Sequence, residues 1–138
     1  MKTARRALLS VLGAALMLAF FPTAANAVVT ACTSSPTATA GGTISVSGST
    51  NMDQSVRFVL DRGTPQAVTL GSLPSIGAPG VSQFNGTLTI PSNVATNTNH
   101  VLTATNPDDT FPFGCGTIFV LAPAPTASPT PVPTASAG

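Results

Sequence analysis

The stretch SVRFVLDRGTPQAVTL, residues 55–70, decides the fold of this chain. Its first half places every second side chain, those of Val56, Phe58 and Leu60, on one face, which is the period-two pattern of a half-buried strand. Residues 61–65 supply turn formers, and residues 66–70 return to an alternating apolar pattern. We therefore predict a β-hairpin over these residues.

Similar short runs lie on both sides of this hairpin, at 28–32, 43–47, 84–90, 100–105 and 116–121. Gly, Pro, Asn or Asp separates each run from the next, and no window after residue 27 has a helical period. About seven short strands with such punctuation are typical of a β-sandwich or a small barrel. Their number and the chain length favour an all-β, immunoglobulin-like β-sandwich.

Two finer expectations follow from the same pattern. Residues 71–80 hold three Gly and two Pro, so we expect a loop there. We expect the core to contain Ile, Val, Leu and the five Phe that follow residue 27. The buried Trp and the tyrosine corner of antibody domains are absent, because the chain has no Trp and no Tyr.

Residues 40–49, AGGTISVSGS, look like the PGGTVTVSGSGF opening of bacterial extracellular immunoglobulin-like domains. LTIPS at 88–92 and TNHVLTAT at 98–105 resemble the closing segment of the same family. The usual Gly-Phe after the first motif is replaced here by residues 50–53, TNMD. The resemblance covers about residues 32–121 and implies an exported, wall-associated spacer or adhesion module. It brings no shared catalytic residue to this chain.

The first 27 residues have the pattern of a cleaved secretory signal peptide with a helical apolar segment. Lys2, Arg5 and Arg6 precede 15 mostly apolar residues, 7–21, which is shorter than the roughly 20 that a transmembrane helix needs. Small residues end the segment, so we predict cleavage between Ala27 and Val28. The mature chain is then expected to be exported and to have no transmembrane segment.

The two cysteines, Cys32 and Cys115, are expected to form one disulfide, because an exported chain folds under oxidising conditions. Residues 29–32 also fit a lipobox, in which Cys32 would carry a lipid anchor. We favour simple secretion for two reasons. Ten residues separate the lipobox cysteine from the apolar run, and lipidation would leave Cys115 unpaired.

Charge excludes a nucleic-acid partner for the mature chain. Beyond residue 27 there are two Arg, four Asp and neither Lys nor Glu, so two positive charges against four negative ones leave a formal charge of −2. Such a surface has no basic patch for phosphates. Residues 122–138 are uncharged and rich in Pro, Ala, Thr and Ser, which predicts a disordered, partly polyproline II tail or stalk.

No catalytic, cofactor or metal site is predicted. His100, the only histidine, opens a β-run and is expected to be a strand residue, so an enzyme would need a pocket that holds His100 with an aspartate. Asp53, Asp108 and Asp109 could join carbonyl groups around Ca²⁺, but their spacing matches neither an EF-hand nor an RTX repeat. Asn85-Gly86-Thr87 fits a glycosylation sequon, although Asn-Gly equally fits a hairpin turn, which we prefer.

These observations leave two main functional hypotheses. The first is a non-enzymatic structural or adhesion module, secreted or associated with the cell surface, whose partners are wall or surface components or another protein. The alternative is a soluble secreted module that binds a protein or glycan, which an apolar patch of Phe111 and Phe113 would favour. The strand at residues 66–70 is a candidate edge for self-association, unless the loop at 71–80 covers it.

Overall fold

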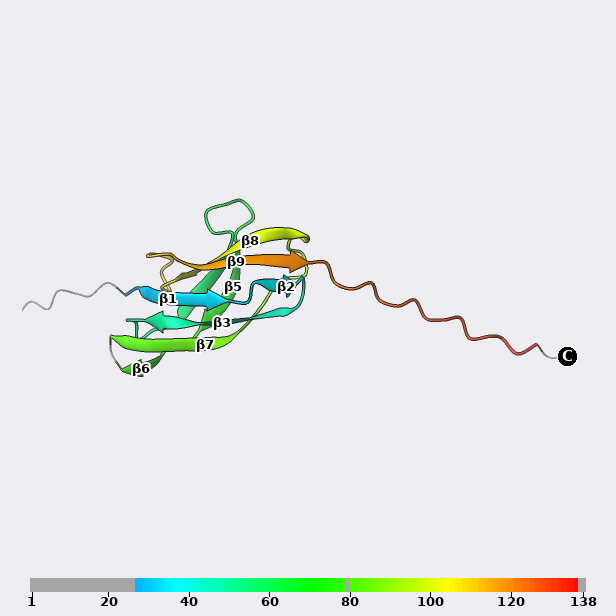
Figure 1. Cartoon of the computed structure of the whole chain (residues 1–138), viewed down its shortest axis with the longest axis horizontal. Helices are drawn as coiled ribbons and strands as arrows, with labels where there is room; N and C mark the ends of the chain where they lie inside the picture. The colour runs from blue at the N-terminus through cyan, green and yellow to red at the C-terminus, as the bar shows by residue number, and fades with distance from the viewer. Residues whose placement is uncertain (1–26, 79, 137–138) are drawn as a thin grey trace, which may run out of the picture.

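The computed structural model describes residues 27–78 and 80–136, so all of the predicted signal peptide, 1–27, except Ala27 lies outside the described residues. The described part contains no helix, and its strands form two sheets that pack face to face as a β-sandwich (Figure 1). The prediction of an all-β sandwich is confirmed. The strands are β1 (Val29–Ser34), β2 (Thr37–Thr39), β3 (Thr43–Thr50), β4 (Val56–Leu60), β5 (Val68–Leu73), β6 (Ile76–Ala78), β7 (Val81–Thr89), β8 (Thr98–Thr105) and β9 (Phe113–Leu121).

One sheet has four strands in the order β1-β3-β7-β6, and the other has five in the order β2-β9-β8-β4-β5. All neighbours are antiparallel except β2 and β9, which are parallel. The chain changes sheets between β1 and β2, where Pro36 interrupts the first strand. The Ser35 N–H donates to the Ser45 carbonyl of one sheet, and the Pro36 carbonyl accepts from Phe119 N–H of the other.

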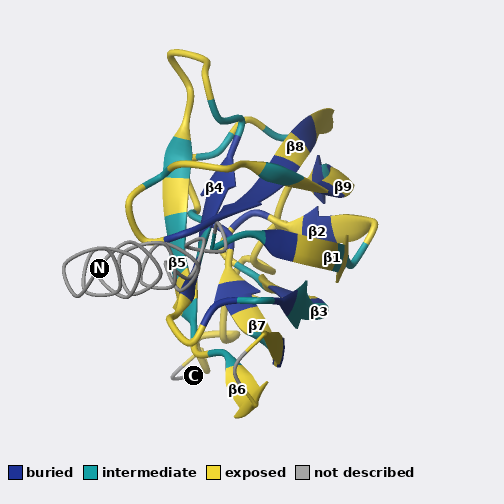
Figure 2. Cartoon of the chain, turned by 90° about the vertical axis from the view of Figure 1, so that its left-hand side faces the viewer, coloured by how far each residue is buried: buried dark blue, intermediate teal, exposed yellow. Residues whose placement is uncertain are grey.

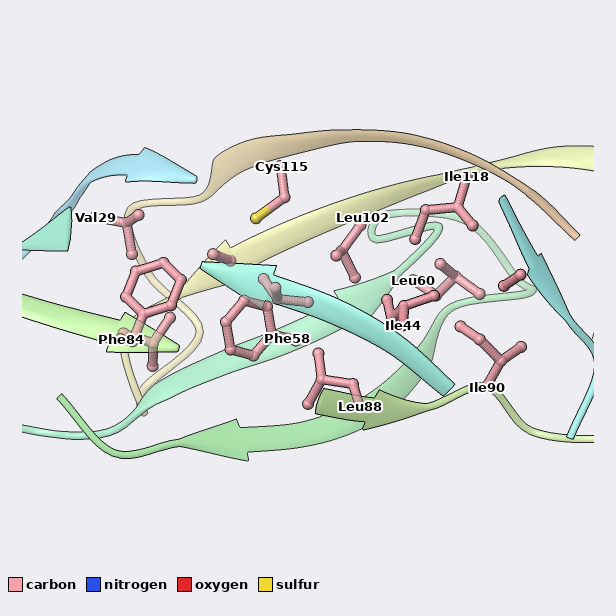
Figure 3. Close-up of a cluster of buried hydrophobic side chains, with 14 of the residues drawn as sticks. Val29, Ile44, Phe58, Leu60, Phe84, Leu88, Ile90, Leu102, Cys115 and Ile118 are labelled. Carbon is pink, nitrogen blue, oxygen red and sulfur yellow. The ribbon is translucent and has the colours of Figure 1, made fainter. Parts of the chain in front are cut away.

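The core lies between the two sheets and follows the alternation seen in the sequence. Val56, Phe58 and Leu60 of β4 are at most 1% exposed, as the period-two pattern predicts. Phe58 meets Phe84 of β7 edge to face, with ring centroids 5.6 Å apart (Figure 3). Buried residues alternate with exposed ones along much of β7, and most loop residues are exposed (Figure 2).

Nine strands replace the seven expected ones, because β2 and β6 were not predicted. The expected loop at 71–80 is wrong in part, since β5 continues to Leu73 and β6 occupies Ile76–Ala78. Two of the glycines in this stretch stand where a side chain would not fit the strand. Gly71, with φ 137°, lies at a β-bulge opposite β4, and a Cβ on Gly77 would meet the Val81 carbonyl oxygen at 2.6 Å.

The preferred hairpin turn at Asn85-Gly86 is also wrong, because both residues lie inside β7 and pair with Ser47 and Val46 of β3. The side chain of Leu73 occupies the space next to Gly86, 2.7 Å from where a Cβ would stand. Glycine therefore serves close packing between the sheets at this position rather than a turn.

The expectation that all five phenylalanines build the core is wrong for two of them, Phe111 and Phe119, whereas Phe113 packs against the core. Phe58 and Phe84 are buried, Phe113 and Phe119 are half-buried, and Phe111 is 46% exposed. Strand parity accounts for part of the difference, because Phe119 falls between the inward-facing Ile118 and Val120 of β9.

Candidate functional site

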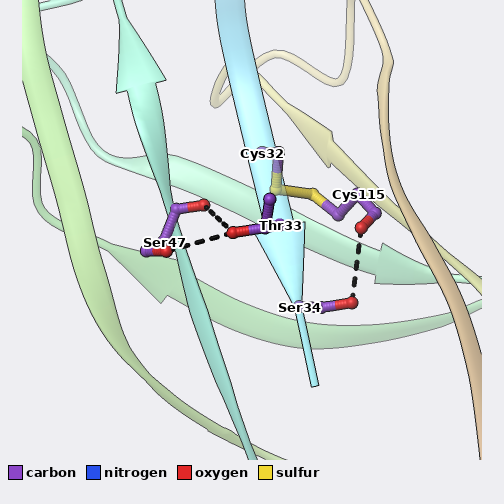
Figure 4. Close-up of a disulfide and its surroundings, with 5 residues drawn as sticks. All are labelled: Cys32, Thr33, Ser34, Ser47 and Cys115. Carbon is purple, nitrogen blue, oxygen red and sulfur yellow. Dashed lines mark hydrogen bonds between the residues drawn. A yellow bond between two sulfur atoms is a disulfide. The ribbon is translucent and has the colours of Figure 1, made fainter. Parts of the chain in front are cut away.

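The predicted disulfide is present in the structure and joins the two sheets. Cys32 of β1 is bonded to Cys115 of β9, with a Cα–Cα distance of 4.7 Å (Figure 4). The Ser34 hydroxyl donates to the Cys115 carbonyl oxygen at 3.3 Å, and the Thr33 and Ser47 hydroxyls lie 3.1 Å apart. The bond therefore holds an edge strand of one sheet against a strand of the other.

A second cluster forms where β4 ends and β8 begins, and Asp61 is its central residue. Asp61 has a positive φ of 52° and starts the turn after β4. Its N–H donates to the Val101 carbonyl at 2.8 Å, and its Oδ1 accepts from the Val101 N–H at 2.9 Å. The carboxylate thus takes the place of a backbone carbonyl and extends the pairing of β4 with β8 by one residue.

His100 is a strand residue, as expected, and its ring is bonded on both sides. The side chain is buried, with Nδ1 2.5 Å from Asp61 Oδ2 and Nε2 2.8 Å from the Ala95 carbonyl oxygen. A carbonyl oxygen only accepts, so Nε2 carries a hydrogen. When the ring is an imidazolium, Nδ1 also donates, and both bonds are made at once.

Two opposing influences act on the pKa of His100. Burial is the largest, and it disfavours the charged ring. The hydrogen bonds to Asp61 and to the Ala95 carbonyl, together with the negative charge of Asp61, outweigh burial and raise the pKa of His100 above its ordinary value. The three segments that meet at the ring are thereby held together best when the ring is protonated.

A pocket of about 570 Å³ lies beside this cluster, between the turn that follows β4 and the loop that precedes β8. Thr64 to Val68 form one wall, Asn93 to Ala95 form another, and His100 and Asp61 also line it. The pocket therefore holds His100 together with an aspartate, which is the arrangement that an enzyme would need. The pair could not be predicted from the sequence, because 39 residues separate its members.

The chemistry available to His100 differs from that of a catalytic base. A general base or a metal ligand needs a ring nitrogen with a free lone pair. Here Nε2 carries its hydrogen toward Ala95, and Nδ1 faces Asp61. The Thr64 hydroxyl, which lines the pocket, donates a hydrogen bond to the Asp61 carbonyl oxygen at 2.8 Å. The contacts of the His100 ring hold together the segments that contain Asp61, Ala95 and His100 itself.

The remaining candidate residues do not come together. Arg62 Nε lies 3.1 Å from Asp109 Oδ1, and this hydrogen bond holds the pKa of Asp109 below its ordinary value. Within residues 27–78 and 80–136, no group of three His, Cys, Asp or Glu side chains is placed to hold a metal ion. Phe111 is exposed but Phe113 packs against the core, so the two do not form the apolar patch considered above.

The predicted cleavage point lies at the first described residues. Ala27 is half-buried and packs against the core. The Val28 N–H donates to Asn51 Oδ1 at 2.7 Å, and the Val28 carbonyl accepts from the Thr50 hydroxyl at 2.9 Å. A chain that begins at Val28 would therefore start with a residue that is already fixed to β3 and its following loop.

Comparison with known proteins finds no family model and no curated sequence that matches this chain. No helix in the described part of the chain is long and apolar enough to cross a membrane.

The His100–Asp61 pair predicts how stability depends on pH. Because the folded-state pKa of His100 is raised, its contribution to stability is complete below the unfolded value of 6.5 and disappears as the pH rises through the raised pKa. Asp61→Asn should lower the free energy of unfolding by about 1–3 kcal/mol at acidic pH and remove this decline. Urea unfolding from about pH 5.5 to 9 measures both effects.

Asp109→Asn, which removes the more exposed ion pair, is the matched control and should leave the decline in place. The mature α-amino group titrates in the same pH window, but it does so equally in all these proteins. A wild-type stability that stays level or rises between pH 6.5 and 9 would contradict the role given to His100.

Proposed function

We propose that the chain is an immunoglobulin-like module. The strand order supports this, because β1-β3-β7-β6 corresponds to strands A-B-E-D of the immunoglobulin sandwich. In the other sheet, β9-β8-β4 corresponds to G-F-C, with β5 in the place of C′. The disulfide differs from that of antibody domains, which joins B to F, because Cys32 and Cys115 lie in the first and last strands.

The module is structural or adhesive, and it is exported to the cell surface or its wall. The observation that carries this proposal is the path of the chain. Val29 begins β1 at one end of the sandwich, and the chain leaves β9 after Leu121 at the opposite end (Figure 1). Residues 122–136 then continue without secondary structure and are exposed throughout. Since the proposed mature chain begins at Val28, its tail leaves the sandwich at the end opposite the N-terminus, an arrangement that is suited to presenting the sandwich at the end of a stalk.

The same module is proposed to be non-enzymatic. His100 and Asp61 line the pocket, but both ring nitrogens are used in contacts that join chain segments. Proton transfer would have to break one of these contacts at a ring that is only 5% exposed. These features favour a structural use of the pair over a catalytic one.

Secretion is favoured over a lipid anchor at Cys32. Lipobox processing would remove residues 28–31, including Val29, which is 4% exposed in the core. It would also use the sulfur that forms the bond to Cys115. Cleavage after Ala27 keeps both the core residue Val29 and the disulfide, so the fold favours this cleavage site.

The alternative, a soluble secreted ligand-binding module, is favoured by one observation. The pocket of about 570 Å³ is within the usual size range for small-molecule sites. Its walls combine apolar side chains such as Val68 and Val94 with the amides and hydroxyls of Thr64, Gln66, Asn93, Thr98 and Asn99, so it would suit an uncharged ligand with both apolar and polar groups.

Self-association is not part of the proposal. β5 does lie at the edge of its sheet, as the candidate strand at 66–70 was expected to do. A β-bulge interrupts its pairing with β4, and Arg57 reaches across to the Thr69 hydroxyl at 2.9 Å. Bulges and charged side chains both discourage the addition of another strand at an edge.

Cell fractionation tests the proposal. In the cells that produce the protein, we expect a chain beginning at Val28 in the wall or surface fraction, accessible to added protease. The intact mass should be lower than that of the full chain by the mass of the signal peptide, and reduction should raise it by the mass of two hydrogens. Recovery with a diacylglyceryl group on Cys32 would contradict the secretion route, and recovery only in the medium would favour the soluble alternative.

A further inference from the structure

Charged residues are nearly absent from the strands of the described chain, and one of the two sheets has none in its strands. None of β1, β3, β7 and β6 contains an Asp, Glu, Lys or Arg. The charged side chains all lie in β4 or in loops, at Asp53, Arg57, Asp61, Arg62, Asp108 and Asp109. One whole sheet of the sandwich therefore presents an outer surface without formal charge from its strands.

This surface consists of hydroxyl and amide side chains. The outward positions of β3 are alternate residues from Thr43 to Ser49, and all of them are Ser or Thr. The outward positions of β7 from Gln83 to Thr89 are Gln, Asn, Thr and Thr. Each lies opposite a partner on the other strand, as Ser45 does opposite Thr87. We call this surface, residues 43–49 of β3 and 83–89 of β7, the hydroxyl face.

An apolar margin borders the hydroxyl face. Ile76 of β6 and Val81 of β7 are 76% and 73% exposed. Their register, Ile76 opposite Gln83 and Ala78 opposite Val81, places them on the same side of the sheet as Gln83. The two side chains place a small apolar surface beside the hydrogen-bonding side chains of the hydroxyl face.

We propose that the hydroxyl face binds a neutral polysaccharide. This inference rests on the proposed function, since it specifies the wall or surface component that the module contacts. Ser, Thr, Asn and Gln side chains both donate and accept hydrogen bonds, as sugar hydroxyls do. Ile76 and Val81 offer apolar contacts for sugar C–H groups.

A face that offers hydroxyl and amide groups without formal charge favours a neutral partner that forms hydrogen bonds. An anionic polymer, a nucleic acid or a charged peptide would find no opposite charge in these strands. A second copy of the chain would have to desolvate two polar faces against each other, whereas a polysaccharide exchanges hydrogen bonds with water for similar ones with the face.

Binding at one module is expected to be weak, because a neutral hydrogen bond contributes only about 0.5–1.5 kcal/mol. The chain has no Trp or Tyr on which a sugar ring could stack. Binding to an insoluble polymer with many equivalent sites remains measurable. Because no ionic contact is involved, it should not weaken when salt screens charges.

Co-sedimentation with insoluble cellulose and chitin tests the proposal, using the mature exported chain with its disulfide intact. Wild type should bind at least one of the two polymers equally at about 0.05 M and 1 M NaCl. Thr87→Lys and Thr87→Asp each place a charge at the centre of the hydroxyl face and should weaken binding about tenfold, because the charge would have to lose water without gaining a partner.

Thr117→Lys and Thr117→Asp are the matched controls, since Thr117 is an exposed strand residue of the other sheet. They should bind as wild type does, and thermal unfolding should show all four variants folded. Absence of binding to both polymers, loss of binding in salt, or unchanged binding by the Thr87 variants would overturn the proposal. The proposed surface location would then still stand on the fractionation result, which does not depend on this face.

Discussion

Replacing Cys32 and Cys115 together by alanine is expected to lower the free energy of unfolding by about 4–5 kcal/mol. The bond joins residues 83 positions apart, so it restricts nearly the whole unfolded domain. A loss of this size approaches the entire stability of many small domains, which is about 5–15 kcal/mol. The variant should therefore be largely unfolded, or close to unfolding, at 37 °C.

Urea unfolding of wild type, with and without reductant, provides the control. Reduced wild type should resemble the double alanine variant, and reductant should leave that variant unchanged. Hydrogen exchange should show β1 opening first, because without the bond this edge strand keeps only β3 as its ladder partner. Equal midpoints for the oxidised and reduced protein would contradict the stabilising role of the disulfide.

The features that could be predicted from sequence are those that one strand specifies by itself. Val56, Phe58 and Leu60 share a face in any register of β4, so their burial follows from alternation alone. The disulfide could also be predicted from the sequence, because an exported chain with two cysteines allows one intramolecular pairing. Neither inference needs to know which strands are neighbours.

The features that could not be predicted depend on pairs of distant segments. Gly86 resembles a turn residue until Leu73 is known to pack beside it from the other sheet. Asp61 resembles an ordinary turn aspartate until the pairing of β4 with β8 brings it to His100. The pocket could not be anticipated for the same reason, because its walls come from separate loops that β8 brings together.

Gly48→Ala is expected to destabilise the protein by about 3 kcal/mol, although it adds only one methyl group. Gly48 lies in β3 opposite Phe84 of β7, with β1 on its other side. A Cβ at this position would overlap both the Ala31 carbonyl oxygen and the ring of Phe84. Neither neighbour moves freely, since Ala31 is held in the β1–β3 ladder and Phe84 is 2% exposed in the core.

Gly114→Ala is the matched control, because Gly114 also lies in a strand but a Cβ there would have no atom within 4 Å. It should be neutral or stabilising by a few tenths of a kcal/mol, about 0.4. Adding Phe84→Leu to Gly48→Ala should recover about 1 kcal/mol relative to the sum of the single changes, because the shorter side chain makes room on the β7 side. The contact with Ala31 would remain, so the recovery should be incomplete.

Equal stability of Gly48→Ala and Gly114→Ala, measured by urea unfolding, would show that β1 and β7 can separate around β3 without loss of stability. The close approach of three strands at Gly48 would then not be what holds the edge strand β1 in the sandwich.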